Sequence, residues 1–206
     1  MKRLVPIAVA CVVVLFVYVP VLGHGFVWDD NGVVIGQRSV MALDWLGMVR
    51  LGLWDDLENV TGTTPYYRQM LVLSFGFEKL VSGSAPWFVH HHSLLWHLAN
   101  VGLLTRLLAP RGGFWAVGIA CLVGLHPTII DAVAFAAARN DLMVTTFLLL
   151  SLAAVRDGKW TWTALFGALA MASKESAVVL PAVLAMTAGG VWRGVRAQRV
   201  PTSTDA

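Results

Sequence analysis

The sequence predicts an all-α integral membrane protein: a polytopic bundle of about six transmembrane helices with a long first external loop that contains interfacial amphipathic helices. Three observations carry this prediction. Of the 206 residues, 57% are hydrophobic and only 13% are charged. The mean hydropathy of +0.70 is not typical of soluble domains. Long apolar runs recur along the chain, and the charges between them sort by sign.

The first apolar run, residues 4–22, is long enough to cross a hydrocarbon core of about 30 Å. It is too long for the apolar region of a secretory signal peptide, and no clear small-x-small cleavage site follows it. We therefore expect a retained first transmembrane helix, with Lys2 and Arg3 holding its start in the cytoplasm.

The segment that follows, residues 23–87, is predicted to be an unusually long external loop. Residues 66–82 within it are apolar but include Arg68, Glu78 and Lys79, so that this stretch would bury charge if it crossed the membrane. We interpret it as an amphipathic helix that lies at the outer interface. Long ordered loops often carry function, which makes this loop a candidate part of a site.

Further apolar runs complete the predicted bundle, although several are short for full spans. They cover residues 88–108, 114–125, 142–155, 162–172 and 177–191. Residues 1–192 then form one transmembrane module, and residues 193–206 form a short basic and then polar cytoplasmic tail that we expect to be disordered.

The charges between these runs predict the orientation. The connectors assigned to the cytoplasm carry Lys2, Arg3, Arg106, Arg111, Arg156, Lys159, Arg193, Arg196 and Arg199, against only Asp157 and Asp205. The opposite connectors collect Asp29, Asp30, Asp44, Asp55, Asp56, Glu58, Asp131, Asp141 and Glu175. The positive-inside rule then places the N-terminus in the cytoplasm and the acidic face on the external, periplasmic or lumenal side. Because the cations are explained as topology determinants, the net charge of +3 does not indicate nucleic-acid binding.

An adjacent carboxylate pair, Asp29 and Asp30, lies just outside the first predicted span. Acids in this position stay hydrated and so avoid the cost of a charge inside the bilayer, yet they are within reach of chemistry at the bilayer surface. Capping or solvating the start of a helix is the simpler explanation for such a pair taken alone. The pair is nevertheless our first candidate for catalysis.

Polar residues recur along the second predicted span at His90, Ser93, His97 and Asn100. Spacings of three, four and three place them in one stripe at about 100° per residue, and this stripe should face the protein interior or a water-filled cavity. Interhelical hydrogen bonding and ligand contact explain it equally well. The run of His90, His91 and His92 also suggests zinc, but consecutive helical side chains point in different directions and no partner ligand stands at the usual spacing.

Three later clusters are predicted on the same external face. His126-Pro127 is followed by Asp131, then Arg139 and Asp141 begin the next apolar run, and Ser173-Lys174-Glu175-Ser176 interrupts two short runs. Pairing between Asp131 and Arg139, or helix capping, would explain one such loop. Three clusters on one face favour a shared site.

These motifs carry a family resemblance through their order. Tyr66-Tyr67-Arg68, the stripe from His90 to Asn100, His126-Pro127 with Asp131-Ala132-Val133, Arg139 with Asp141, and Ser173-Lys174-Glu175 follow one another as in a single family. The chain resembles the N-terminal half of a GT-C glycosyltransferase of the TMTC-like class, the polytopic relatives of protein O-mannosyltransferases. Each motif is short, so the resemblance depends on their order and spacing.

The resemblance implies a function and a site. The function is transfer of a mannose-type sugar from a polyprenyl-phosphate carrier to a hydroxyl acceptor, on a protein or a glycan, at the external membrane face. Asp29, Asp30 and Asp131 are then the candidate catalytic acids. The candidate substrate-binding residues are Arg68, His90, His97, Asn100, His126, Arg139, Asp141, Lys174 and Glu175. A divalent cation is possible in such enzymes, but no metal ligand set is indicated by the sequence.

Two alternatives from other classes remain. Family members usually carry more transmembrane helices and often a C-terminal repeat domain, so the chain could be a truncated non-catalytic remnant or an assembly subunit. A small-solute transporter would place its polar residues near the bilayer midplane within related repeats. No internal repeat is visible, and the acids lie at the ends of the predicted spans.

Overall fold

The computed structural model describes residues 4–53, 57 and 66–185. Within these ranges every regular element is a helix, and extended pairing is limited to an isolated bridge between Gln37 and Leu57. The prediction of an all-α fold is confirmed for this part of the chain. The predicted tail at 193–206 and most of the predicted acidic stretch at 55–58 lie outside the described residues.

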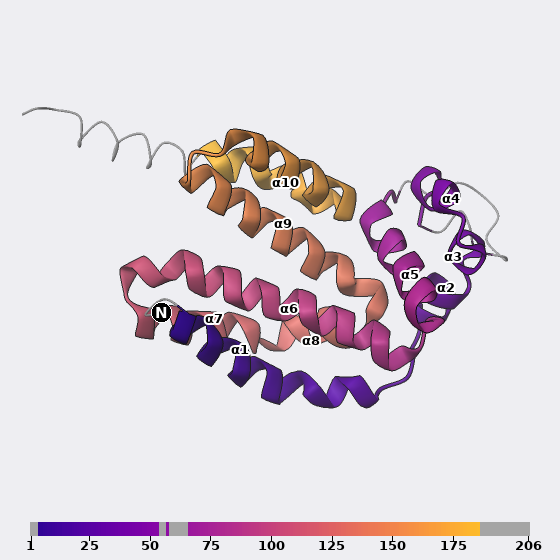
Figure 1. The fold of residues 1–206 in the computed structure, drawn as a ribbon, viewed down its shortest axis with the longest axis horizontal. Coiled ribbons are helices and arrows are strands. Elements are labelled where there is room, and N and C mark those ends of the chain that lie inside the picture. The colour runs from indigo at the N-terminus through magenta and orange to yellow at the C-terminus, as the bar shows by residue number, and fades with distance from the viewer. Residues whose placement is uncertain (1–3, 54–56, 58–65, 186–206) are drawn as a thin grey trace, which may run out of the picture.

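The helices of the bundle run along the molecule in alternating directions, with the short α8 continuing the course of α7 (Figure 1). They are α1 (Leu4–Tyr18, continued by the 3-10 turn Val19–Gly23), α6 (Pro86–Leu108), α7 (Gly113–Gly124), α8 (Ile130–Ala134), α9 (Arg139–Arg156) and α10 (Trp160–Ser173). A further apolar helix, Glu175–Ala185, turns back from the end of α10. Between the long helices lie 3-10 turns at Ala109–Arg111, Pro127–Ile129 and Ala136–Ala138.

The two ends of this bundle differ in charge. The acidic end holds Asp29, Asp30, Asp141 and Glu175, where α6 and α9 begin and α10 finishes (Figure 1). The basic end holds Arg106, Arg156 and Lys159, where α1 begins and α6 and α9 finish. Charges that the sequence assigns to opposite connectors therefore lie at opposite ends of the molecule.

Four helices form a cap over the acidic end: α2 (Asp30–Ile35), α3 (Arg38–Ala42), α4 (Trp45–Arg50) and α5 (Gln69–Ser82) (Figure 1). Their apolar side chains, such as Val34, Met48 and Phe75, join a buried cluster that continues to Phe147 of α9. Gly83 ends α5 with a positive φ of 68°, a conformation that costs glycine little. The cap is thus part of the core and is not a detached loop.

Two helices are long and apolar enough to cross a membrane, Leu4–Gly23 and Ala136–Arg156. A third span results if α7 and α8 count as one helix, bent by 57° at Pro127. The side chain of Phe16 on α1 is 81% exposed and that of Leu122 on α7 is 72% exposed, as expected for lipid-facing residues. These helices identify a membrane protein with two or three candidate spans among the described residues, and the predicted bundle of about six is not confirmed.

Candidate functional site

The polar stripe on α6 lies inside the protein. The side chains of His90, Ser93, His97 and Asn100 are all buried. Each contacts a different element: His90 Nε2 donates to the Gly25 carbonyl at 3.3 Å, and His97 Nε2 donates to the Gly124 carbonyl at 2.9 Å. Asn100 Nδ2 donates to the Leu142 carbonyl at 2.9 Å. The stripe therefore fastens α6 to three neighbours, which is the interhelical bonding that the sequence left open.

Arg139, at the start of α9, is completely buried. Its Nη1 donates to Glu78 Oε1 at 2.5 Å, its Nε to Ser93 Oγ at 2.9 Å, and its Nη2 to the Val89 carbonyl at 2.7 Å. The guanidinium also stacks over the Phe75 ring at 5.1 Å. All three nitrogens are used within the protein, so this cation holds α5, α6 and α9 together, and it lines none of the cavities described below.

Glu78 connects that cation to a histidine. Its Oε1 also contacts His92 Nδ1 at 2.6 Å, while the indole Nε1 of Trp96 donates to His92 Nε2 at 3.1 Å. Because an indole N–H only donates, His92 Nε2 must accept, and the ring proton then lies on Nδ1 facing Glu78. The cluster of Arg139, Glu78, His92 and Trp96 thus has one consistent hydrogen-bond pattern.

Two ion pairs join the remaining predicted residues at the acidic end. Lys174 Nζ lies 2.5 Å from Asp141 Oδ1, and Arg68 Nη2 lies 2.8 Å from Glu175 Oε1. The hydrogen bond from Arg68 lowers the pKa of Glu175. The start of α5, the start of α9 and the turn after α10 therefore meet, although they are far apart in sequence.

The two acids of the first pair differ in exposure. Asp29 is exposed, whereas Asp30 is fully buried and accepts from the Ala137 N–H at 2.8 Å through Oδ1. Burial raises the pKa of Asp30, and hydrogen bonds from the backbone N–H groups of Ala137 and Val27 oppose that rise. In this structure solvent reaches Asp29 and Asp131 but does not reach Asp30.

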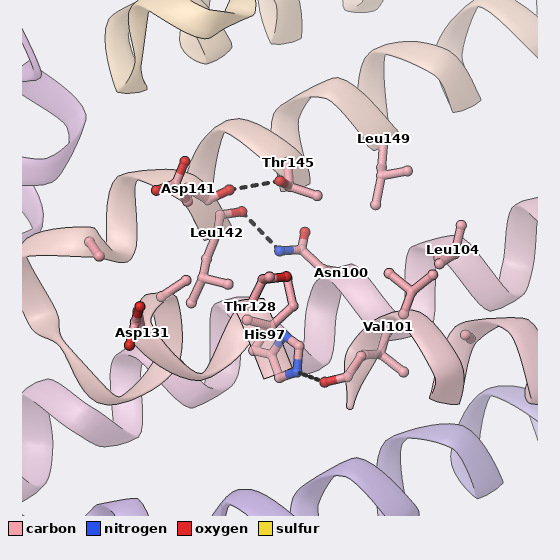
Figure 2. A pocket seen from close by; sticks show the side chains of 16 residues that line it. His97, Asn100, Val101, Leu104, Thr128, Asp131, Asp141, Leu142, Thr145 and Leu149 are labelled. Atoms are coloured by element: carbon pink, nitrogen blue, oxygen red, sulfur yellow. Dashed lines mark hydrogen bonds between the residues drawn. The ribbon is translucent and has the colours of Figure 1, made fainter. Parts of the chain in front are cut away.

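A cavity of about 630 Å³ lies between α6, the broken helix α7–α8 and α9. Figure 2 shows Asp131 and Asp141 on one side of it and Leu104 and Leu149 on the other. Val101 continues the apolar part of the wall, and Asn100, Thr128 and Thr145 add polar groups between the two sides. The cavity is therefore amphipathic: its two acidic residues lie on the side opposite its aliphatic residues.

A second cavity, of about 560 Å³, adjoins the loop that precedes α2. Its wall includes His24, Trp28, Phe135 and Asp131. Trp28 has a positive φ of 47°, which is unusual for a bulky side chain, and its 84% exposed ring contacts Phe135 edge to face. Asp131 lines both cavities and so marks the place where they approach each other.

The break between α7 and α8 produces this arrangement. α7 ends at Gly124, Pro127 cannot continue the helix, and His126 Nδ1 accepts from the Thr128 N–H at 3.3 Å to begin the 3-10 turn. His126 itself is exposed, and its ring nitrogen lies 2.8 Å from Thr128 Oγ1. The bend directs Thr128 and Asp131 toward the cavity wall.

Sequence reasoning missed Glu78, His92 and the two threonines of the cavity, Thr128 and Thr145. Glu78 and Arg139 stand 61 residues apart, so only their shared apolar surroundings signal a buried pair. His92 and Trp96 are four residues apart on one helix face, a spacing that predicts contact. The threonines carry no comparable signal.

The chain is similar to proteins named protein O-mannosyl-transferase TMTC2. It is 27% identical to the mouse protein over 187 residues, 84% of this chain, and 29% identical to the fruit-fly protein over 205 residues, 91% of this chain. The frog protein is 28% identical over 187 residues. This chain spans only about a fifth of these relatives, 22% of each. No protein-family model and no solved structure matches it. The resemblance predicted from the ordered motifs is confirmed by these relatives.

Proposed function

We propose that this chain forms the carboxylate-bearing part of a membrane glycosyltransferase. The enzyme would transfer a mannose-type sugar from a polyprenyl-phosphate carrier to a hydroxyl group, foremost a Ser or Thr of a protein. The observation that carries the proposal is the amphipathic cavity, which offers an aliphatic wall to a lipid and carboxylates to a sugar at its other side. The named activity of the similar proteins supports it.

The proposed orientation puts the acidic end outside and the basic end in the cytoplasm. Trp28, Trp45 and Trp87 are exposed at the acidic end, and Trp115, Trp160 and Trp162 are exposed at the basic end. Indole rings collect at the two membrane interfaces, so two belts at opposite ends support a multi-pass arrangement with the bundle across the bilayer. Arg106, Arg156 and Lys159 would then lie on the cytoplasmic side.

The carrier would lie in the larger cavity. Its isoprenoid units would pack against Val101, Leu104 and Leu149, and its sugar would reach Asp131 and Asp141. The acceptor would enter the second cavity, which Trp28 and Phe135 border, because aromatic rings suit both sugars and peptides. Asp131 would then stand between donor and acceptor.

The proposed reaction is a single displacement with inversion. The acceptor oxygen attacks the anomeric carbon while an exposed carboxylate, Asp131 or Asp29, takes its proton. The bond between the anomeric carbon and the phosphate oxygen breaks, and the lipid phosphate leaves with the electron pair. Lys174 would exchange its contact with Asp141 for a contact with this phosphate and neutralise the added charge.

The buried residues of the predicted site would position these groups. Asp30 ties the loop before α2 to Ala137, which precedes α9, and so fixes the wall next to Asp131. Arg139 and His90 would support α6 and its neighbours. His97 and Asn100, which line the larger cavity, would contact the donor, and His126 would hold Thr128 at the wall. Arg68 and Glu175 would keep the turn that carries Lys174 in place.

The test uses membranes that contain the chain and a radiolabelled polyprenyl-phosphate mannose with a photoreactive isoprenoid. We expect the native chain to be labelled, and Leu104→Trp, which fills the cavity, to lose labelling. Leu95→Trp is the matched control because Leu95 is 49% exposed on the same helix. Equal labelling of all three chains would exclude the cavity as the lipid site.

Transfer to an acceptor peptide tests the acids separately. Whichever of Asp131 and Asp29 takes the proton, its replacement by Asn should reduce transfer about a hundredfold, the lower end of the range for general base catalysis. Asp157→Asn, an exposed acid at the basic end, should leave transfer unchanged. Transfer that is equal in every variant would remove both acids from the mechanism. Labelling without any transfer would favour the assembly-subunit alternative, and appearance of free sugar across the membrane would favour a transporter.

A further inference from the structure

A third cavity lies at the basic end, far from the proposed site. It has a volume of about 330 Å³ and lies between the start of α1, the end of α6 and the end of α9. Arg106 and Arg156 line it together with Asp157, and Leu4, Ile7 and Pro110 supply apolar wall. Two guanidinium groups thus share a small cavity at the edge of the bundle.

Both cations are available to a ligand. Arg156 is exposed, and its Nη1 donates at 3.0 Å to the carbonyl of Leu107, in the last turn of α6. This bond holds the guanidinium at the cavity while four of its five N–H groups stay available. Arg106 is also exposed, and within the described ranges neither arginine has a carboxylate within 4.0 Å.

We propose that this cavity binds the phosphate of an anionic phospholipid headgroup. Two arginines against one aspartate leave a formal charge of +1 on its wall. Guanidinium groups match phosphate oxygens as paired donors, and basic pockets between transmembrane helices suit phospholipid headgroups. Leu4 is 67% exposed and Val5 is 62% exposed beside the cavity, so an acyl chain has apolar surface to follow from the headgroup along α1.

The lipid source is favoured over free phosphate by that apolar surface. A soluble phosphate would use only the guanidinium groups of this wall. A phospholipid also buries its glycerol and upper acyl chain against Ile7 and Pro110, which adds hydrophobic contact to the charge pairing.

The test follows unfolding of the full chain in a neutral detergent by Trp fluorescence. Three additives are compared: a phosphatidylglycerol, a phosphatidylcholine with the same acyl chains, and inorganic phosphate. We expect phosphatidylglycerol alone to raise the unfolding temperature in a saturable manner. Arg106→Gln should weaken the apparent affinity about fivefold, which corresponds to about 1 kcal/mol for one basic contact, and Asp157→Asn should strengthen it.

Matched variants separate a specific site from general surface charge. Lys159→Gln removes an exposed cation from the same end that does not line the cavity, so it should leave the affinity unchanged. Arg106→Gln is the decisive variant because Arg156 also bonds the Leu107 carbonyl, whereas the Arg106 side chain has no such hydrogen bond to the part of the chain that the structure describes. Equal stabilisation by inorganic phosphate would overturn the lipid assignment. An unchanged affinity in Arg106→Gln, or an equal loss in Lys159→Gln, would overturn the site.

Discussion

Arg139 and Glu78 show how a single buried charge depends on its partner. Each side chain is fully buried, and each would carry a large desolvation cost if it stood alone. Ser74 and Ser93 hydroxyls and the Val89 carbonyl accept from the other guanidinium N–H groups. The charge is therefore tolerated because every nitrogen of Arg139 has a partner.

Replacing Arg139 should consequently be among the most destabilising changes in the chain. Arg139→Met leaves the buried Glu78 side chain without its cation, and we expect a loss of about 3–5 kcal/mol in the free energy of unfolding. Lys174→Met breaks a partly exposed pair with Asp141 and should cost about 1 kcal/mol or less. Unfolding by SDS in mixed micelles measures both. Similar losses for the two variants would contradict a special role for the buried pair.

Asp30 predicts how stability changes with pH. Its pKa is raised by burial above the usual value of 3.8, so between that value and the raised pKa the folded chain binds more protons than the unfolded chain. Its contribution to stability is therefore present at low pH and is lost as the pH rises through the raised pKa.

The check compares the native chain with Asp30→Asn from pH 4 to pH 7. The unfolding temperature of the native chain should fall as the pH rises through the raised pKa of Asp30. The Asp30→Asn chain should lack this part of the fall, because the amide does not titrate. Asp29→Asn, which changes the exposed neighbour, should keep that decline. Parallel profiles for all three chains would show that Asp30 does not titrate in this range.

At the scale of elements, periodicity predicted the face of α6 but could not predict its partners. The spacing of His90, Ser93, His97 and Asn100 is enough to place them on one buried stripe. The acceptors of His90, His97 and Asn100 come from Gly25, Gly124 and Leu142, and Ser93 accepts from Arg139. No local pattern identifies these partners. For residues 66–82 the charge of Glu78 led us to expect an amphipathic helix at the interface. In the structure the Glu78 side chain is buried against Arg139 of α9, a partner that the local sequence does not reveal.

The contact between α7 and its neighbours depends on Gly124. A Cβ atom at this position would lie 2.8 Å from Val101 Cγ2 on α6 and 3.2 Å from Val14 Cγ2 on α1. The Gly124 carbonyl also accepts from His97 at the wall of the larger cavity. The absence of a side chain therefore lets three helices meet where α7 ends.

Gly124→Ala should push these helices apart and cost about 1–3 kcal/mol of stability, the usual range for overpacking. Gly118→Ala is the control on the same helix, since nothing lies within 4 Å of its Cβ position, and it should be neutral or slightly stabilising. Thermal unfolding and carrier photolabelling are measured together. We expect Gly124→Ala to lower both the unfolding temperature and the photolabelling. A stability equal to that of Gly118→Ala would contradict the close contact.

At the scale of the whole molecule, the separation of the acidic end from the basic end predicts that the two ends lie on opposite sides of the membrane. Cysteines introduced at Leu46, 56% exposed in the cap, and at Lys159, exposed at the basic end, should react with a membrane-impermeant maleimide from opposite faces. The two native cysteines, Cys11 and Cys121, are only partly exposed, and the unsubstituted chain gives their background. Reaction of both positions from one face would contradict the proposed topology.

The site as a whole was predictable only in part. The charges of Asp131, Asp141 and Lys174 placed them together on one face, and the structure brings them to one end of the bundle. That Asp131 lines two cavities follows from the bend at Pro127, which sets α8 at 57° to α7. Sequence patterns locate the break, but the volume beside it depends on how α6 and α9 pack across it.

The pairing of Glu78 with Arg139 also has a consequence for biosynthesis. A nascent chain emerges from its N-terminus, so Glu78 is synthesised 61 residues before its cation, Arg139. Until then Glu78 lacks its guanidinium partner, and burying its carboxylate in apolar surroundings would carry a large desolvation cost. The cap would therefore assemble late, once α9 has been inserted. Ribosome-bound chains that stop before Arg139 should expose α5 to proteases that spare longer chains.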